Sequence, residues 1–143
     1  MPVSAFTLRA FEPSDYDAAR ALWERSEGVG LSSADERDAI LRYLARNPGM
    51  SFVAEDDGIV GTILCGHDGR RGLIHHLVTA ESHRRRGVAK ALLDRSIDAL
   101  SREGIHKCHF MVFRDNADGV AFWKKVGAEE RVSLSLFSIA TDG

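Results

Sequence analysis

The sequence feature that most constrains the fold is a helix-length segment, residues 87–103, with an apolar run on each side of it. At about 100° per residue, Ser96 and the apolar side chains of this segment lie on one half of a helical wheel, whereas Lys90, Asp94 and Asp98 lie on the other half. The flanking runs, "LIHHLVT" (73–79) and "KCHFMVF" (107–113), are typical of strands. This order predicts a βαβ crossover in which the amphipathic helix packs on a sheet.

Shorter patterned segments surround the crossover, without a linker or an internal repeat between them. In chain order, the expected elements are a strand at 6–11, a helix capped by Ser14, a second helix capped by Ser33, a hairpin at 51–66 that turns at Asp57-Gly58, a short helix at 116–127 and a final strand at 131–139. The complete order, β-α-α-β-β-β-α-β-α-β, indicates an α/β or α+β sandwich. We expect a single domain, residues 1–143.

Composition excludes several classes of protein. The chain has 143 residues and a net charge of −2, which argues against a protein that binds nucleic acid through its overall charge. Cys65 and Cys108 have no partner at metal or redox spacing, so we expect reduced, buried thiols and no metal site. The N-terminus lacks the apolar segment of a secretion signal, and no apolar run approaches the roughly 20 residues of a membrane span. A cytoplasmic protein without membrane contact is expected.

The turn that enters the crossover helix has the composition of an anion site. The stretch "RRRGVAK" (84–90) lies between a strand and a helix N-terminus, where several backbone N–H groups lack partners within the helix. Gly87 and Ala89 leave room for a phosphate to approach these groups, and Arg84–Arg86 can bond its oxygens. The alternative is a solvated basic cluster. Because arginines are unfavourable at this end of the helix dipole, the pattern favours an anionic partner.

Two spaced motifs identify a family. The turn lacks a P-loop and a dinucleotide-binding fingerprint, but it contains Arg84-x-x-Gly87-x-Ala89 after an apolar strand. At this point the sequence resembles the GCN5-related N-acetyltransferase (GNAT) superfamily, whose pyrophosphate-binding motif has this spacing. Downstream, "NADGVAFWKKVGAEE" (116–130) is similar to the second signature of the family. The resemblance covers essentially the whole chain.

The resemblance implies a fold and an acetyl-CoA site. In this family a mixed, mostly antiparallel central sheet has helices on both faces, and acetyl-CoA, the co-substrate, lies where two strands splay apart, here 73–79 and 107–113. The N–H group of Leu77 would polarise the thioester carbonyl. The residues implied in cofactor binding are Leu77, Val78 and Thr79 along the pantetheine arm, Arg84, Arg85, Arg86, Gly87, Val88, Ala89 and Lys90 around the pyrophosphate, and Asn116 and Phe122 beside the pantetheine.

The resemblance also implies direct attack by a neutral amine on the thioester, which requires a proton acceptor. Some members carry their general base at the position of His75, and histidine suits this role near neutral pH. Simple alternation would place Leu73, His75 and Leu77 on one side of the strand and His76 on the other. The alternative is that His75 and His76 only fill a strand. Glu55 is a further candidate base that could act through water.

The general acid is the point at which this chain departs from the family. Many members use a tyrosine in the second motif to protonate the leaving thiolate, whereas this sequence has Phe122-Trp123 there. Neither Tyr16 nor Tyr43 is expected at that place. Either another group supplies the proton or the thiolate leaves unprotonated, which a thiol pKa of about 8.5 makes tolerable.

Three functions remain open at this level. The first is an acetyl-CoA-dependent N-acetyltransferase whose acceptor is a small-molecule or peptide amine that meets the loop at 26–36, where Glu27, Asp35 and Glu36 lie. The second is a CoA-binding sensor or partner module without turnover. The third, a nucleic-acid-binding domain using Arg70, Arg71 and Arg84–Arg86, is disfavoured by net charge. The oligomeric state is left open, with a homodimer as one option.

Overall fold

In the computed structural model, which describes residues 5–142, the chain divides into a larger unit that ends at Phe113 and a smaller unit that begins at Arg114. The predicted absence of a leader and the two ends of the predicted domain fall on residues 1–4 and 143, which lie outside the described residues.

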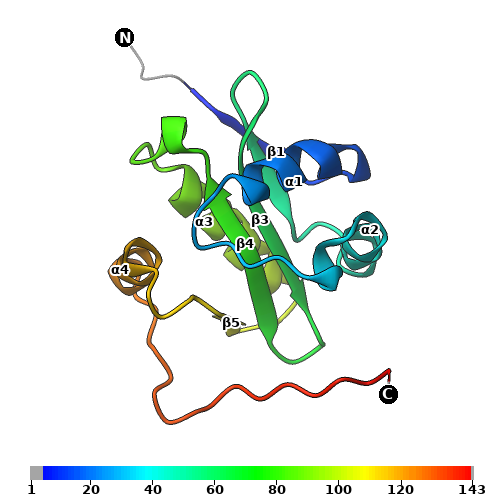
Figure 1. The fold of residues 1–143 in the computed structure, drawn as a ribbon, viewed down its shortest axis with the longest axis vertical. Helices are drawn as coiled ribbons and strands as arrows, with labels where there is room; N and C mark the ends of the chain where they lie inside the picture. Colours follow the sequence, from blue (N-terminus) through cyan, green and yellow to red (C-terminus); the bar gives the residue numbers. More distant parts are fainter. Residues whose placement is uncertain (1–4, 143) are drawn as a thin grey trace. The chain divides into compact units, whose positions relative to one another are not determined.

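A five-stranded sheet forms the centre of the larger unit (Figure 1). Its strands follow chain order across the sheet: β1 (Thr7–Ala10), β2 (Phe52–Glu55), β3 (Ile59–His67), β4 (Gly72–Thr79) and β5 (Cys108–Phe110). Neighbouring strands are antiparallel except β4 and β5, which are parallel, as the predicted crossover requires. The expected mixed, mostly antiparallel sheet is confirmed.

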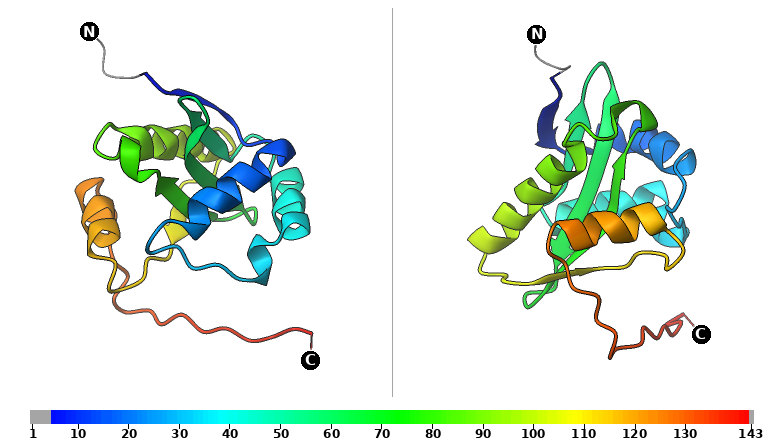
Figure 2. Two further views of the ribbon diagram at one scale, coloured as in Figure 1. Left: turned by 45° about the horizontal axis from the view of Figure 1, so that its top comes forward. Right: turned by 90° about the vertical axis from the view of Figure 1, so that its left-hand side faces the viewer.

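Helices cover both faces of this sheet (Figure 2). Helix α1 (Tyr16–Glu24) packs on one face, where its Trp23 bonds Thr62 of β3, and α2 (Arg37–Arg46) lies on the same face. Helix α3 (Val88–Arg102) packs on the other face, since a Cβ at Gly61, the neighbour of Thr62, would meet Val88 and Leu92. Consecutive strand residues point to opposite faces, so these two contacts place α1 and α3 on opposite sides.

The amphipathic pattern of α3 is confirmed with one departure. Val88, Leu92, Leu93 and Leu100 are buried against the sheet, and so is Ser96, whose hydroxyl donates to the backbone carbonyl of Met50 at 2.8 Å. Ile97 is 44% exposed, because it lies at the edge of the buried stripe. The hairpin turn is also as expected: Asp57 and Gly58 both have positive φ.

The N-terminal caps of the first two helices differ from the prediction: Asp15, the N-cap of α1, follows the predicted Ser14 by one position, and Glu36, the N-cap of α2, follows the predicted Ser33 by three. Ser14 lies inside a short 3-10 helix, η1 (Pro13–Asp15), and Asp15 is the N-cap of α1. Ser32, rather than Ser33, caps a second 3-10 helix, η2 (Ser33–Asp35), by accepting from the N–H of Ala34. Each helix is preceded by one tight turn, which the apolar periodicity does not register.

The smaller unit contains one helix, α4 (Ala117–Lys125), closed by Gly127 at a φ of 94°. The final strand expected at 131–139 is wrong: this segment has no strand in the structure. Its apolar side chains are exposed, with Phe137 at 88% and Ile139 at 90%. An alternating pattern forms a strand only where another strand supplies hydrogen bonds, and within residues 5–142 no strand pairs with this segment. Strand β5 (Cys108–Phe110) is also shorter than the predicted 107–113, and it ends where its pairing with β4 ends.

Candidate active site

Strand β4 extends beyond the end of β5, the parallel strand at its side. The parallel pairing of β4 with β5 joins Gly72 to Cys108, Leu73 to His109 and Ile74 to Phe110, where β5 ends. Strand β4 continues to Thr79, and within residues 5–142 no other strand pairs with its last five residues on that side. Unpaired backbone groups along a strand edge can accept an extended ligand as an added strand. This edge is therefore suited to a pantetheine-like chain.

A bulge interrupts β4 within this edge. Against β3, Val78 pairs with Thr62 and His75 pairs with Leu64, so His76 and Leu77 together oppose the single residue Ile63. His76 has a φ of 47°, a left-handed conformation that costs on the order of 1–3 kcal/mol for a residue other than glycine.

The simple alternation predicted for this strand is wrong at the bulge. His75 contacts the Tyr43 ring of α2, and His76 contacts the Trp23 ring of α1, so both imidazoles lie on the face covered by α1 and α2. Simple alternation would have put them on opposite faces. The extra residue explains the difference, because it shifts the side-chain pattern by one position.

His75 is a half-buried imidazole beside an aromatic ring. Its ring centroid lies 6.0 Å from that of Tyr43, at an edge-on angle of 75°. Burial lowers the pKa of His75 below its ordinary 6.5, and the neighbouring His76 lowers it further. His75 is therefore neutral at pH 7 and can accept a proton.

Tyr43 carries a buried hydroxyl with no hydrogen-bond partner in the part of the chain that the structure describes. Burial raises the pKa of this phenol, so it stays protonated. An unpaired buried hydroxyl costs about 1–3 kcal/mol, and such groups are uncommon in native proteins. The position of Tyr43 next to His75 was not expected from the sequence, which offers no signal for this contact between α2 and β4.

His76 is held by polar contacts from two elements, η2 and β3. Its Nε2 lies 2.6 Å from Oδ1 of Asp35, and its carbonyl oxygen accepts from the hydroxyl of Thr62 at 2.8 Å. Thr62 in turn accepts from the indole N–H of Trp23 at 2.9 Å. Sequence reasoning missed these partners; the signals that pointed towards them were the adjacent histidines in a strand and the capping spacing Ser32-x-x-Asp35.

The N-terminus of α3 is open in the manner that the anion hypothesis requires. Gly87, at a φ of 82°, is the N-cap, and no side chain caps the helix. A Cβ at Gly87 would meet no atom within 4 Å, so the space beside it is free. Arg84 and Arg85 are exposed next to it, and Lys90 is paired with Asp94 at 2.7 Å.

The structure brings most of the predicted site residues together on one continuous path. His75 and Leu77–Thr79 lie on the unpaired end of β4, and the short turn with η3 (Glu81–His83) leads directly to Arg84–Lys90 at the start of α3. Asn116 and Phe122 belong to the smaller unit. There, Asn116 caps α4 by accepting from the N–H of Gly119 at 3.0 Å, and their roles in cofactor binding stay predictions.

Glu55 lies apart from this path. It is on β2, with β3 between it and β4, and its carboxylate accepts from Nε of Arg9 at 2.8 Å. Arg9 also bonds Asp15 through both terminal nitrogens. The hydrogen bond from Arg9 lowers the pKa of Glu55, which weakens it as a base. This geometry favours a structural role for Glu55.

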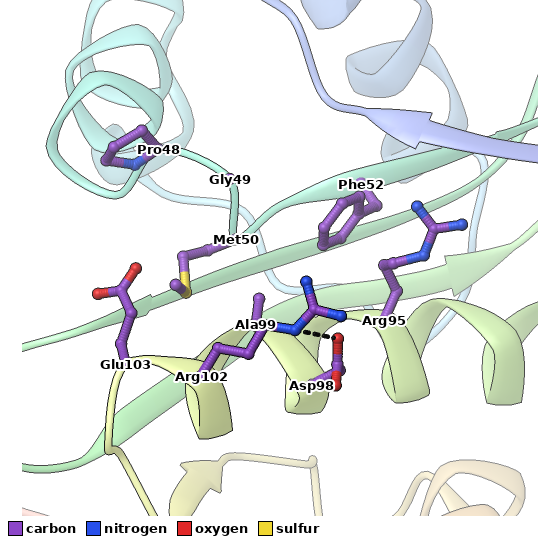
Figure 3. Close-up of a pocket in the computed structure, with 9 residues that line it drawn as sticks. All are labelled: Pro48, Gly49, Met50, Phe52, Arg95, Asp98, Ala99, Arg102 and Glu103. Carbon is purple, nitrogen blue, oxygen red and sulfur yellow. Dashed lines mark ion pairs between the residues drawn. The ribbon is translucent and has the colours of Figure 1, made fainter.

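A shallow groove of about 360 Å³ lies between α3 and the segment that leads into β2 (Figure 3). Its charged lining is already engaged: Arg102 pairs with Asp98 at 3.0 Å, and the Arg95 guanidinium lies over the Phe52 ring at 5.4 Å. None of the predicted site residues lines it. Elsewhere in residues 5–142, no group of three or more His, Cys, Asp or Glu side chains could hold a metal ion, and no helix is long and apolar enough to cross a membrane.

Comparison with known proteins decides the family. The family model for the acetyltransferase (GNAT) family matches residues 16–128, which is most of the chain. The chain belongs to the GNAT family. The resemblance drawn from the two motifs is thus confirmed, and the protein is an N-acetyltransferase of the family that uses acetyl-CoA.

Individual relatives agree with this assignment. An acetyltransferase from Pectobacterium atrosepticum is 36% identical over 123 residues, which cover 85% of this chain and 86% of that protein. A crystal structure of a predicted acetyltransferase from Clostridium acetobutylicum, solved with acetyl-CoA, has the same fold at a TM-score of 0.75 and 19% identity, covering 94% of this chain and 96% of that chain. The structure of Ard1 from Thermoplasma volcanium gives a TM-score of 0.74 at 24% identity, covering 86% and 82%.

Proposed function

We propose that this GNAT enzyme transfers the acetyl group of acetyl-CoA to a primary amine by direct attack, without a covalent enzyme intermediate. The observation that carries the proposal is the unpaired end of β4, which leads through a short turn into the uncapped N-terminus of α3. A strand edge for an extended amide-bearing arm and a helix end for a pyrophosphate are the two features that acetyl-CoA requires.

Binding is divided between these two features. The backbone of Leu77, Val78 and Thr79 pairs with the pantetheine arm. The N–H groups of the first turn of α3 bind the pyrophosphate, with Arg84–Arg86 and Lys90 adding charge. Gly87, Val88 and Ala89 form the backbone of this cradle.

In the chemical step, the nitrogen of the neutral amine forms a bond to the thioester carbon. The N–H group of Leu77 stabilises the negative charge that develops on the carbonyl oxygen. His75 accepts the proton that the amine nitrogen loses, and the C–S bond then breaks. The CoA sulfur leaves as a thiolate, and because a thiol has a pKa of only about 8.5, it can leave without a proton from a protein acid. This departure is in keeping with Trp123 at the usual tyrosine position.

The acceptor is the amine of a small molecule or of a peptide end. This amine is a cation until it loses its proton. Of the three acids expected in the loop at 26–36, Glu27 and Glu36 are exposed and available to a cation. Asp35 is not available, because it is buried and bound to His76. An acceptor that carries a positive charge near the amine is therefore favoured.

Thermal unfolding with and without acetyl-CoA tests the binding half of the proposal. Ligand at 100 times its dissociation constant adds about 2.7 kcal/mol to the free energy of unfolding, which raises the midpoint measurably. Release of CoA thiol across a panel of amines tests the chemical half. A shift without turnover would favour a CoA-binding module over the enzyme, and no shift with either acetyl-CoA or CoA would contradict both.

A further inference from the structure

We propose that His76 is a positioning residue: its contacts with Asp35, Trp23 and Thr62 hold the bulge of β4 in the geometry that directs the Leu77 N–H group and the His75 side chain at the thioester. This inference rests on the proposed function above, and it deepens that proposal by assigning a role to side chains that contact neither substrate.

The bulge needs to be held because its conformation is unfavourable in isolation. His76 has a φ of 47°, whereas a strand residue other than glycine prefers a negative φ. If His76 relaxed to an extended conformation, β4 would regain its regular alternation, and the residues next to it would turn towards the opposite faces. Both Leu77, which follows the bulge, and His75, which precedes it, depend on this one backbone angle.

Three contacts oppose that relaxation, and they involve side chains that are largely or fully buried. The His76 ring lies 4.6 Å from the Trp23 ring, and its Nε2 lies 2.6 Å from Asp35, with only 12% and 10% of the two side chains exposed. The backbone carbonyl of His76 accepts from Thr62, which is fully buried. Each of three parts of His76 is thus held by a different neighbour: its ring by Trp23, its Nε2 by Asp35 and its carbonyl oxygen by Thr62.

Asp35 is itself fixed, which makes it a firm anchor. Its Oδ2 accepts from the N–H of Ser32 at 2.9 Å, and its carbonyl oxygen accepts from the Tyr16 hydroxyl at 2.6 Å and from Arg20 at 3.1 Å. Asp35 is the second-last residue of the loop at 26–36, to which the proposed function assigns the acceptor. The same carboxylate therefore connects the acceptor loop to the catalytic strand.

The test uses a buried hydroxyl in a matched set of variants. Thr62→Val keeps the shape of the side chain and removes its bonds to the His76 carbonyl and the Trp23 indole. Thr62→Ser keeps the hydroxyl. Ser96→Ala is the control, because Ser96 is equally buried and donates to the Met50 carbonyl at the same 2.8 Å on the opposite face of the sheet.

We expect Thr62→Val to lower kcat by about 10- to 100-fold, since small misplacements of reacting groups have effects of this size. The dissociation constant of acetyl-CoA should change by less than about threefold, because the pyrophosphate cradle is untouched. Thr62→Ser should restore kcat. Ser96→Ala should lower the melting temperature and leave kcat near that of the wild type.

A second measurement is independent of turnover. In the ligand-free protein, the backbone amide resonance of Leu77 should shift or broaden in Thr62→Val and should stay at its wild-type position in Thr62→Ser and Ser96→Ala. Asparagine tolerates a positive φ and valine does not, so His76→Asn should retain more activity than His76→Val.

The outcomes separate the two proposals. A wild type that neither binds acetyl-CoA nor releases thiol overturns the proposed function and the catalytic role of the bulge together. An active wild type with an equally active Thr62→Val overturns the positioning role alone. An unmoved Leu77 resonance in Thr62→Val overturns it whatever the activity, and so does a Ser96→Ala variant that loses kcat to the same extent.

Discussion

At the scale of single residues, backbone strain is concentrated at the proposed acetyl-CoA site. Asp57, His76 and Arg85 are the described residues other than glycine with a positive φ. Asp57 lies in a hairpin turn, where this conformation is ordinary, whereas His76 lies in the β4 bulge and Arg85 lies in the turn before α3. Such conformations cost on the order of 1–3 kcal/mol each and persist where surrounding contacts hold them. His76 has such contacts.

The unpaired Tyr43 hydroxyl leads to a prediction about stability. Tyr43→Phe should leave the free energy of unfolding unchanged or raise it by about 1 kcal/mol, because it removes a buried group that bonds nothing. Tyr16→Phe is the control and should lower it by about 1 kcal/mol, since the Tyr16 hydroxyl donates to the Asp35 carbonyl at 2.6 Å. Urea unfolding of both variants measures the difference. Equal losses would mean that Tyr43 also has a partner.

The lowered pKa of His75 fixes the direction of two pH effects. As the proposed base, His75 should give the kcat/KM profile an acidic limb with a midpoint below pH 6.5, and His75→Ala should lose that limb while still binding acetyl-CoA. Stability should fall as the pH drops below 6.5, because the unfolded chain binds a proton there that the folded His75 resists. An acidic limb that persists unchanged in His75→Ala would contradict the assignment of the base.

At the scale of elements, the two ends of α3 provide a matched comparison. Gly87 at its start and Gly104 just beyond its end have φ values of 82° and 81°, and a Cβ at either would meet no atom within 4 Å. The two positions thus present the same backbone constraint. They differ in that Gly87 faces the proposed pyrophosphate site and Gly104 does not.

We therefore predict that Gly87→Ala and Gly104→Ala destabilise the fold equally, by about 1 kcal/mol, from the cost of a left-handed alanine. Only Gly87→Ala should also weaken acetyl-CoA binding, which isothermal titration measures for both variants. Equal acetyl-CoA affinity in the two would argue against a pyrophosphate at the start of α3.

At the scale of the whole molecule, the packed sheet protects ionisable groups from water. Burial raises the pKa of the Cys65 thiol to about 12 and raises that of Cys108. Cys65 is completely buried on β3, and Cys108 is half-buried on β5. Neither thiol should react rapidly with a thiol reagent, because the thiolate is the reactive form.

Stability should therefore decrease at high pH. Above about pH 9 the unfolded Cys65 thiol loses its proton, whereas the folded one keeps it to about pH 12, so the unfolded state is favoured progressively over this interval. The expected slope approaches about 1.4 kcal/mol per pH unit for one such group. Urea midpoints at pH 7, 9 and 10.5 measure it, and Cys65→Ala should reduce the slope. A slope unaffected by this substitution would show that Cys65 ionises normally in the fold.

Much of the fold was predictable because it depends on local patterns. The stripe of Val88, Leu92 and Leu100 predicts α3 without reference to the rest of the chain, and Asp57-Gly58 predicts its own turn. The pyrophosphate candidates Arg84–Lys90 follow in the same way from a glycine at a helix start. The predicted caps were displaced, by one position for α1 and by three for α2, because a single 3-10 turn before a helix leaves no periodic signal.

The sequence by itself determined the crossover, the arginine-glycine turn and the family, since each rests on residues close together in the chain. Only the tertiary structure decided which face His75 and His76 occupy, because the bulge depends on contacts from distant segments: Asp35 and His76 are separated by 41 positions. It also decided that residues 131–139 form no strand, since alternation describes a side-chain pattern and a strand requires a partner's hydrogen bonds. Local preference sets what a segment can become, and long-range contacts select which of those forms it takes.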